Sequence, residues 1–310
     1  MTRVCVLMTT YNPRKYVVDQ VNSILNQKDV EVKIIIRDDA STNKEWIDKL
    51  PKCDNIIIIH GDKNIGVAHN IMALIEYAYN NETDYEYFAY SDQDDIWKDD
   101  KIVTGIRALS SLNKTKPCLY YSNLLVVDED LKNGFPMFKS GVVRNTLAQS
   151  LAQIFTFACT TVFNYQMIVE LMKHPIDYMG FDHLLYYIAI IKGDIVYDDT
   201  PHILYRQHGD NVSGVKQKGF RYYITKMTGL LQKKKEDKAR AGGGSFKDMA
   251  KYIKKYYYED LYEQDRVLVD KVATYGGINS RIKIIIDKRI KAGYMPKDFY
   301  GSIRLLFGKY

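Results

Sequence analysis

The sequence predicts an α/β protein with a mostly parallel sheet, helices on both faces of the sheet, and a helical C-terminal region. Three observations support this fold class. Short apolar segments alternate with segments of helical periodicity throughout residues 1–214, as is typical of parallel sheets covered by helices. The four consecutive isoleucines at 56–59 fit a strand that is buried on both faces. After residue 214 the strand signals stop, and Lys- and Tyr-rich helical segments follow.

The predicted elements follow from these patterns in chain order. Runs rich in β-branched and aromatic residues predict strands at residues 4–8, 32–36, 55–60, 85–90, 118–128, 194–199 and 202–206. Apolar residues at helical spacing predict helices at residues 16–25, 67–79, 98–112 and 181–191. Residues 134–138 (GFPMF) are predicted to be a loop, and residues 150–163 carry no clear signal. We place a boundary near Gly214, with a catalytic domain at 1–214 and a basic, Tyr-rich helical region at 215–310.

Composition narrows the class of protein. A chain of 310 residues is long enough to bury a full core in one or two domains. The four cysteines are far apart and form no CxxC pair, so we expect reduced thiols in a cytoplasmic protein. The first ten residues are a strand candidate rather than a secretion signal. No apolar run approaches the ~20 residues that a membrane span needs.

The net charge of +6 is unevenly distributed along the chain. Residues 215–310 contain 23 Lys and Arg against 10 Asp and Glu, whereas residues 1–214 contain 21 against 28. A basic tail indicates an anionic partner. We expect this partner to be the inner face of the cell membrane, with the protein bound peripherally, and we expect no nucleic acid. The alternative is a solvated helical appendage that packs on the catalytic domain or forms a homodimer.

Four polar clusters follow the first four predicted strands. They are TTYN (9–12), RDDAS (37–41), GDKNIG (61–66) and SDQDD (91–95). Because ligands bind at the carboxyl ends of strands in an open parallel sheet, the clusters predict a polar crevice along one edge. The first strand–helix turn lacks both a GxGxxG and a GxxxxGK[ST] pattern, so a glycine loop is not expected to bind a diphosphate.

The last cluster contains the carboxylates of Asp92, Asp94 and Asp95 within four residues. Carboxylates this close repel one another unless positive charge lies among them. Mg²⁺ or Mn²⁺ would supply this charge and would bridge the acids to substrate phosphates. The alternative is that Asp94 or Asp95 caps the helix that begins near Lys98. Both roles can hold at once, with one acid capping and another on the metal.

The motifs TTYN, RDDAS, NIGVAHN, SDQDDIW and YRQHGDNVSG together resemble those of family-2 glycosyltransferases, which have the GT-A, Rossmann-like fold. The resemblance covers roughly residues 3–214. The variant SDQDDIW with a late YRQHGDN is most similar to bacterial rhamnosyltransferases that build cell-surface polysaccharides. It implies an inverting, metal-dependent transfer of L-rhamnose from the nucleotide sugar dTDP-rhamnose to a polysaccharide or lipid-linked glycan.

The resemblance also implies roles for individual residues. Those implied to bind the nucleotide sugar, along the first three clusters, are Thr9, Tyr11, Asn12, Asp38 or Asp39, Asn64, Gly66 and Asn70. Asp92 would lie toward the ribose and the metal, Asp94 would bind the metal, and Asp95 is an additional acid beside it. From residues alone, the alternative for 38–41 is an Asx turn that caps the next helix.

Two later motifs complete the implied site. Asp182 matches the general base, which would take a proton from the acceptor hydroxyl; its alternative is a helix N-cap. His183 and Leu184 stand where the family commonly has two tryptophans, which leaves acceptor specificity open. In YRQHGDN, Arg206 and Gln207 suit a diphosphate, and His208 suits the metal or the phosphate. The alternative for this motif is a packed strand end.

Two other functions remain open from the sequence. A sugar nucleotidyltransferase would also need a metal and an α/β fold, but it would be expected to carry a Gly- and Arg/Lys-rich loop after the first strand. A non-catalytic scaffold at a membrane surface is disfavoured because Asp92, Asp94 and Asp182 are intact.

Overall fold

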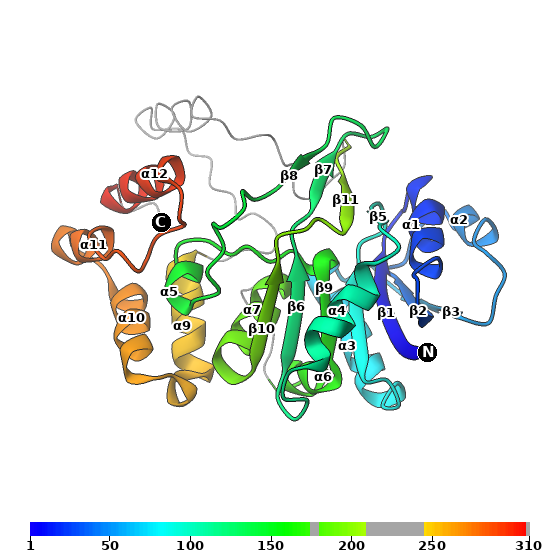
Figure 1. The fold of residues 1–310 in the computed structure, drawn as a ribbon, viewed down its shortest axis with the longest axis horizontal. Helices are drawn as coiled ribbons and strands as arrows, with labels where there is room; N and C mark the ends of the chain where they lie inside the picture. Colours follow the sequence, from blue (N-terminus) through cyan, green and yellow to red (C-terminus); the bar gives the residue numbers. More distant parts are fainter. Residues whose placement is uncertain (174–179, 209–244, 308–310) are drawn as a thin grey trace.

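The computed structural model describes residues 1–173, 180–208 and 245–307, which form two sheets with helices around them (Figure 1). The larger sheet has seven strands in the order β10-β6-β9-β4-β1-β2-β3. Its strands are β1 (Thr2–Thr10), β2 (Val30–Asp38), β3 (Ile56–His60), β4 (Tyr87–Ser91), β6 (Cys118–Ser122), β9 (Thr161–Asn164) and β10 (Asp194–Asp198). The smaller sheet contains β5 (Ile96–Trp97), β11 (Ile203–Arg206), β7 (Leu125–Val127) and β8 (Phe135–Pro136), in that order.

Helices cover both faces of the larger sheet, as predicted. One face packs against α1 (Tyr16–Leu25) and α4 (Lys101–Ser110), and the other against α3 (Val67–Asn81), α6 (Tyr165–Leu171) and α7 (Phe181–Lys192). The alternation along β1 divides its side chains between the two cores. Val4 and Val6 belong to the core under α1, whereas Cys5 and Leu7 belong to the core under α3. Two shorter helices are α2 (Glu45–Asp48) and α5 (Leu147–Ser150).

The structure corrects two predicted elements. The predicted strand at 118–128 is two strands, because β6 ends at Ser122 and β7 belongs to the other sheet. Asn123 makes this change of sheet favourable: its side chain donates to the Phe138 carbonyl (2.8 Å) and accepts from the Phe138 N–H (3.1 Å), which satisfies backbone groups at the bend. The predicted loop at 134–138 contains the short strand β8, which pairs with β7.

The segment without a clear sequence signal forms the antiparallel part of the sheet. It contains η1 (Ala158–Thr160) and β9, which lies between β4 and β6 and runs antiparallel to both. All other strand pairs in this sheet are parallel, so the prediction of a mostly parallel sheet is confirmed.

The C-terminal region is helical, as predicted, and lies beyond the β10 edge of the sheet (Figure 1). It consists of α9 (Phe246–Tyr256), η2 (Tyr258–Asp260), α10 (Glu263–Thr274), α11 (Ile278–Ile285) and α12 (Met295–Leu306). Met249, Ile253 and Val269 belong to the same hydrophobic cluster as the buried residues of α7. The predicted boundary near Gly214 lies outside the described residues. Across the residues that the structure describes, none of the helices is both long and apolar enough to cross a bilayer.

Candidate active site

Three parallel strands bring their polar carboxyl ends to the same edge of the larger sheet. Thr10 of β1 pairs with Asp38 of β2, and Met8 of β1 pairs with Ser91 of β4. The second sheet completes this edge, because β11 pairs antiparallel with β5 just after the acidic cluster. Arg206, the last residue of β11, and His208 just after it are thereby brought back to acids more than a hundred positions earlier in the chain.

Asp38 organises the loops at the ends of β1 and β2. Its buried carboxylate accepts hydrogen bonds from the Thr10 hydroxyl (3.0 Å) and from the Ser41 N–H (2.9 Å). The Ser41 hydroxyl accepts in turn from the N–H of Asn12 (2.7 Å), whose φ is +41°. Asp38 therefore closes the turn at 38–41 but does not cap α2, which begins after Lys44. Its contact with the nucleotide sugar stays a prediction.

Tyr11 and Thr9 face different surroundings. The Tyr11 side chain is 47% exposed, while its backbone N–H donates to the Gln93 side chain (2.9 Å). This places an accessible aromatic ring beside the acidic cluster, where it can stack on a base. The Thr9 hydroxyl is buried and pairs with the Tyr90 hydroxyl (2.7 Å).

Asp39 holds the turn that leads into α3. Its carboxylate accepts from the N–H of Gly66 (2.9 Å) and from that of the preceding residue (3.0 Å), and it lies 3.6 Å from the guanidinium of Arg37. Arg37 also donates to the buried side chain of Asn70. Asn64 accepts from the Gly66 N–H (3.1 Å). Gly66 has a φ of +82°, a conformation that favours glycine. The predicted residues Asp39, Asn64, Gly66 and Asn70 thus belong to one network of polar contacts, in which Arg37 links Asp39 to Asn70.

The three acids of the SDQDD cluster lie in different environments. Asp95 is fully buried, and one of its carboxylate oxygens accepts from the Arg206 N–H (3.2 Å). Asp94 contacts the His208 ring nitrogen Nε2 (2.8 Å). Burial, followed by the neighbouring charge of Asp94, raises the pKa of Asp92 to about 7. The pKa of Asp95 is raised for the same two reasons. The alternative that Asp94 or Asp95 caps the next helix is wrong, because the N-cap of α4 is Asp100.

These acids fit a divalent cation. Oxygens of Asp92 and Asp95 and the sulfur of Cys159 lie within 4.8 Å of one another, and the second oxygen of Asp95 is buried with no hydrogen-bond partner among the described residues. Burial raises the pKa of the Cys159 thiol well above its ordinary value, and sulfur is a soft donor that Mg²⁺ and Mn²⁺ do not favour. The carboxylate oxygens are the donors that Mg²⁺ and Mn²⁺ prefer.

Arg206 joins three parts of the site. Its buried side chain donates to the backbone carbonyls of Asp94 (3.0 Å) and Glu129 (2.6 Å), and it lies over the ring of Tyr16 at 4.4 Å. The backbone N–H of Gln207 donates to the Val127 carbonyl (2.9 Å). Arg206 thus holds the acidic turn in position. The contacts of Arg206 and Gln207 with a diphosphate stay predictions.

Asp182 lies in the first turn of α7. The N-cap of this helix is Gly180, so the alternative that Asp182 is the N-cap is wrong. Its carboxylate accepts from the His183 N–H (3.0 Å), and its charge contributes to the raised pKa of Asp92. The preceding residue, Phe181, packs on Tyr90 at 5.4 Å between ring centroids. The structure therefore brings the predicted base close to the acidic cluster.

Lys101 is the site residue that the sequence reasoning missed. It is fully buried beneath the acidic cluster, with its Nζ 3.6 Å from the centre of the Trp97 ring and 3.3 Å from the Thr161 carbonyl. Burial lowers its pKa to about 7, against the opposing charges of Cys159 and Asp95. The sequence held one signal for this burial. Lys101 precedes Gly105 and Leu109 by four and eight residues, and this spacing places all three on the buried face of the same helix.

Comparisons with known proteins show what the chain is similar to. The model of the family described as "Glycosyl transferase family 2" matches residues 5–162. The chain is 29% identical over 256 residues to the "dTDP-rhamnosyl transferase RfbG" of Shigella flexneri, which is 72% of this chain and 84% of the relative. It is 27% identical over 222 residues to the "UDP-Glc:alpha-D-GlcNAc-diphosphoundecaprenol beta-1,3-glucosyltransferase WfaP" of Escherichia coli, 70% of this chain and 82% of the relative.

Solved structures show the same fold. The structure of S. aureus TarS residues 1–349 in complex with UDP-GlcNAc aligns with a TM-score of 0.56 and 14% identity, over 99% of this chain and 91% of that one. The corresponding complex with UDP aligns with a TM-score of 0.52 and 14% identity, over the same shares. The predicted GT-A fold is confirmed by this likeness, which carries no information on the sugar.

Proposed function

The chain belongs to glycosyl transferase family 2 and is a glycosyltransferase, and from this premise we propose that it transfers L-rhamnose from dTDP-rhamnose with inversion to a hydroxyl of a cell-surface polysaccharide or its lipid-linked precursor. One observation carries the proposal. The acids that follow β4, the segment 206–208 at the end of β11, and Asp182 of α7 meet at one edge of the sheet. This edge holds the groups needed for a nucleotide sugar and for proton removal.

The donor sugar is proposed from the relatives. The S. flexneri protein is named as a dTDP-rhamnosyl transferase and matches most of this chain. The E. coli protein, named as acting with UDP-Glc, matches a similar share. The names of both, with that of a Bacillus subtilis teichuronic acid glycosyltransferase, support a role in polysaccharide synthesis. A direct comparison of dTDP-rhamnose with UDP-glucose therefore decides the donor.

Asp182 is proposed to act as the general base. Its carboxylate is 32% exposed, in contrast to the fully buried Asp95, so an acceptor can reach it. It would take the proton from the acceptor hydroxyl as the oxygen attacks the anomeric carbon. The bond from that carbon to the nucleotide diphosphate breaks, and the electron pair leaves with the diphosphate. One displacement from the opposite face inverts the anomeric centre.

A divalent cation is proposed at the acidic cluster. Asp92, Asp94, Asp95 and His208 would hold Mg²⁺ or Mn²⁺. When bound, the ion would neutralise the charge that develops on the departing diphosphate. His208 lies against Asp94 through the contact described above, and Arg206 keeps the backbone of Asp94 in place. The Arg206 guanidinium supplies local positive charge beside the acidic turn even before a substrate arrives.

The alternative of a nucleotidyltransferase finds less support. The turn after β1 has neither the Gly-rich nor the Arg/Lys-rich loop expected of such an enzyme. Instead, Tyr11 and Asn12 close this turn through contacts with Gln93 and Ser41. A non-catalytic scaffold would have no need for the accessible acid at Asp182.

Calorimetry with nucleoside diphosphates tests the proposal. We expect dTDP to bind more tightly with Mn²⁺ or Mg²⁺ than with EDTA, and Asp94→Asn to lose this difference. Asp84→Asn, which alters an exposed acid before β4, serves as the matched control. With donors, we expect slow hydrolysis of dTDP-rhamnose and less of UDP-glucose. Equal dTDP affinity with and without metal would reject the cation, and faster use of UDP-glucose would reject the rhamnose assignment.

The C-terminal region is proposed to hold the enzyme at the inner face of the membrane. On α11 and its C-cap, Ile278, Ile282 and Ile286 recur every four residues and are 51%, 42% and 67% exposed. Residues at this spacing share one helix face, and the segment 281–291 also contains five Lys and Arg. An exposed apolar face beside basic side chains is typical of helices that lie in an anionic membrane surface.

A further inference from the structure

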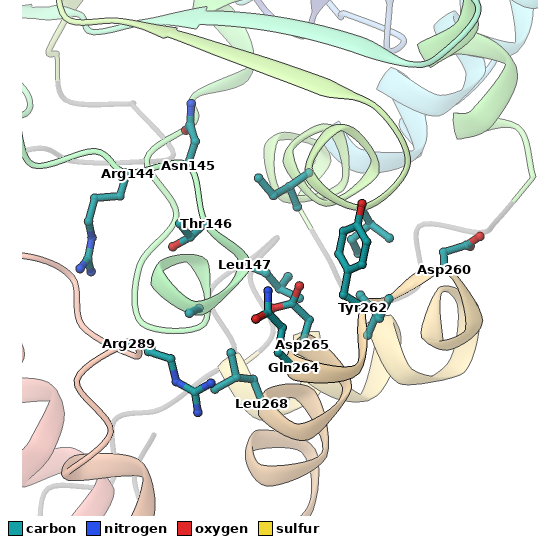
Figure 2. Close-up of a pocket in the computed structure, with 14 residues that line it drawn as sticks. Arg144, Asn145, Thr146, Leu147, Asp260, Tyr262, Gln264, Asp265, Leu268 and Arg289 are labelled. Carbon is teal, nitrogen blue, oxygen red and sulfur yellow. The ribbon is translucent and has the colours of Figure 1, made fainter.

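A cavity of about 450 Å³ lies between α5, α7 and α10 (Figure 2), and no residue of the acidic cluster lines it. Its wall is formed by residues 144–148, by Ile190 and Ile191 at the end of α7, by residues between 260 and 268, and by Arg289. The volume is within the range of roughly 300–1,000 Å³ that small-molecule sites occupy. The family motifs described above include none of these residues.

The lining combines apolar and polar side chains. Leu147, Leu261 and Leu268 are buried and contribute apolar surface. The polar side chains around them, drawn in Figure 2, include Arg144, Asn145, Thr146, Asp260, Tyr262, Gln264, Asp265 and Arg289. Such a mixture suits a ligand that has both C–H surface and hydroxyl groups.

Several polar groups of the cavity are available to a ligand. Among residues 1–173, 180–208 and 245–307, the amide of Gln264 and the carboxylate of Asp265 make no side-chain hydrogen bond. Arg144 donates to the Lys291 carbonyl (2.7 Å) and has further N–H groups in its guanidinium. Arg289 is already committed to the carboxylate of Asp287 (2.9 Å). The cavity therefore offers both donors and acceptors.

The charges of the lining favour an uncharged ligand. Two arginines are balanced by Asp260 and Asp265, so neither a nucleotide nor a cation would find a net opposite charge. Tyr262 is 78% exposed, and an accessible aromatic ring can pack on the C–H face of a sugar. Hydroxyl groups of the sugar would pair with the planar side chains of Gln264, Asp265 and Arg144. A neutral saccharide satisfies all these features.

The cavity also lies within reach of the transfer site. Asp182 and Ile190 belong to the same helix, α7, and eight residues of helix rise by about 12 Å. We propose that the cavity is a subsite for the acceptor glycan, which holds a sugar residue behind the one whose hydroxyl reacts. The inference rests on the proposed transferase function. The subsite would also explain why the C-terminal helices pack against the catalytic part, because α10 supplies one of its walls.

Saccharide binding is measured without a donor, by saturation-transfer NMR and titration calorimetry on the full chain. The probes are a tetrasaccharide of L-rhamnose and maltotetraose. The variants are Tyr262→Ala and Gln264→Ala, both at exposed side chains; Tyr262 makes no side-chain cap on α10. Tyr79→Ala, an exposed tyrosine on α3, is the matched control.

We expect a probe to bind the wild-type protein and the control with the same Kd. Each of the two variants should raise the Kd of the probe by roughly tenfold, which corresponds to about 1.4 kcal/mol. The Kd for dTDP should not change. Failure of both probes to bind the wild type, or equal binding by the variants, overturns the subsite. If the wild-type protein does not bind dTDP, the proposed function is contradicted instead. The two results are distinguishable because saccharide binding is measured without a donor.

Discussion

Asp182 differs from the other acids of the site because it is accessible and lies on a rigid helix. Its carboxylate accepts only the N–H of His183 among the hydrogen bonds of the described residues, whereas Asp38 and Asp39 each hold a loop through several hydrogen bonds. A side chain that is little used in the fold can be replaced without loss of structure.

We therefore expect Asp182→Asn to fold and to bind dTDP with wild-type affinity, but to transfer sugar more slowly by ~10²-fold or more, the usual range for a general base. Initial rates at saturating donor, with dTDP affinity by calorimetry, measure this. The exposed Asp84→Asn is the control. A variant with wild-type kcat would remove Asp182 from the mechanism.

Asp287 shows how a single residue secures the C-terminal region. Its buried carboxylate accepts from Arg289 and lies 2.6 Å from the Nζ of Lys271 on α10. The hydrogen bonds from Arg289, joined by that from Lys271, hold the pKa of Asp287 well below its ordinary value. A carboxylate with a lowered pKa in the folded state stabilises that state above its unfolded pKa of about 3.9.

This sign sets a pH-dependent prediction. Asp287→Asn should unfold at lower denaturant concentration than the wild type above about pH 5, and the gap should narrow as the pH falls below about 4, where the wild-type carboxylate begins to lose its advantage. Urea unfolding at pH 7, 5, 4 and 3 measures the difference. Asp130→Asn, at an exposed acid, is the control. A gap that is constant with pH would contradict the assigned role of the ion pairs.

At the scale of elements, the junction between α7 and β10 depends on a close backbone approach. Gly193 is the C-cap of α7, and a Cβ placed there would meet the Pro117 carbonyl oxygen at 1.7 Å. The next residue, Asp194, donates to this same carbonyl (3.0 Å) at the start of the β10–β6 pairing. Only glycine lets the helix end close enough to begin this strand pair.

Gly193→Ala should accordingly lower the free energy of unfolding by about 3 kcal/mol, the upper end of the usual cost of overpacking, because the clash is with backbone rather than with a mobile side chain. Gly276→Ala is the matched control, since a Cβ there has open space around it. Urea denaturation of both variants gives the comparison. Equal stability of the two would show that β10 can shift freely.

At the scale of the whole molecule, the C-terminal helices share a core with the catalytic part. Met249, Tyr252 and Val269 lie in one continuous cluster with the residues under α3 and α7. A chain cut at residue 214 would expose this surface to water, so truncation would confuse unfolding with loss of membrane binding. Surface substitutions on α11 test membrane contact without this complication.

We expect the full chain to sediment with vesicles rich in anionic lipid at low salt and to be released as salt rises, because screening shortens to ~8 Å near physiological ionic strength. Ile282→Glu, on the exposed face of α11, should weaken this binding. Val67→Glu, at an exposed apolar position on α3, is the control. Equal sedimentation of the two variants, or no preference for anionic lipid, would favour packing or a dimer interface for this face.

The sequence by itself determined the elements of the catalytic part and which of their ends carry function. Helix α1 occupies the predicted residues 16–25, and strands β1 to β4 fall where apolar runs predicted them. These features are local: periodicity of two or 3.6 residues records which face is buried. The motifs TTYN, RDDAS and SDQDDIW also predicted the family, and the match to the family model confirms this prediction.

Only the tertiary structure decided which residues meet. The antiparallel insertion of β9, the change of sheet at Asn123 and the burial of Lys101 have their causes in residues distant along the chain. Arg206 binds the acidic turn across 112 positions because β11 pairs beside β5. The cavity between α5, α7 and α10 likewise exists only once the C-terminal helices have packed. Contacts of this kind depend on strand order and helix packing, which short-range periodicity does not encode.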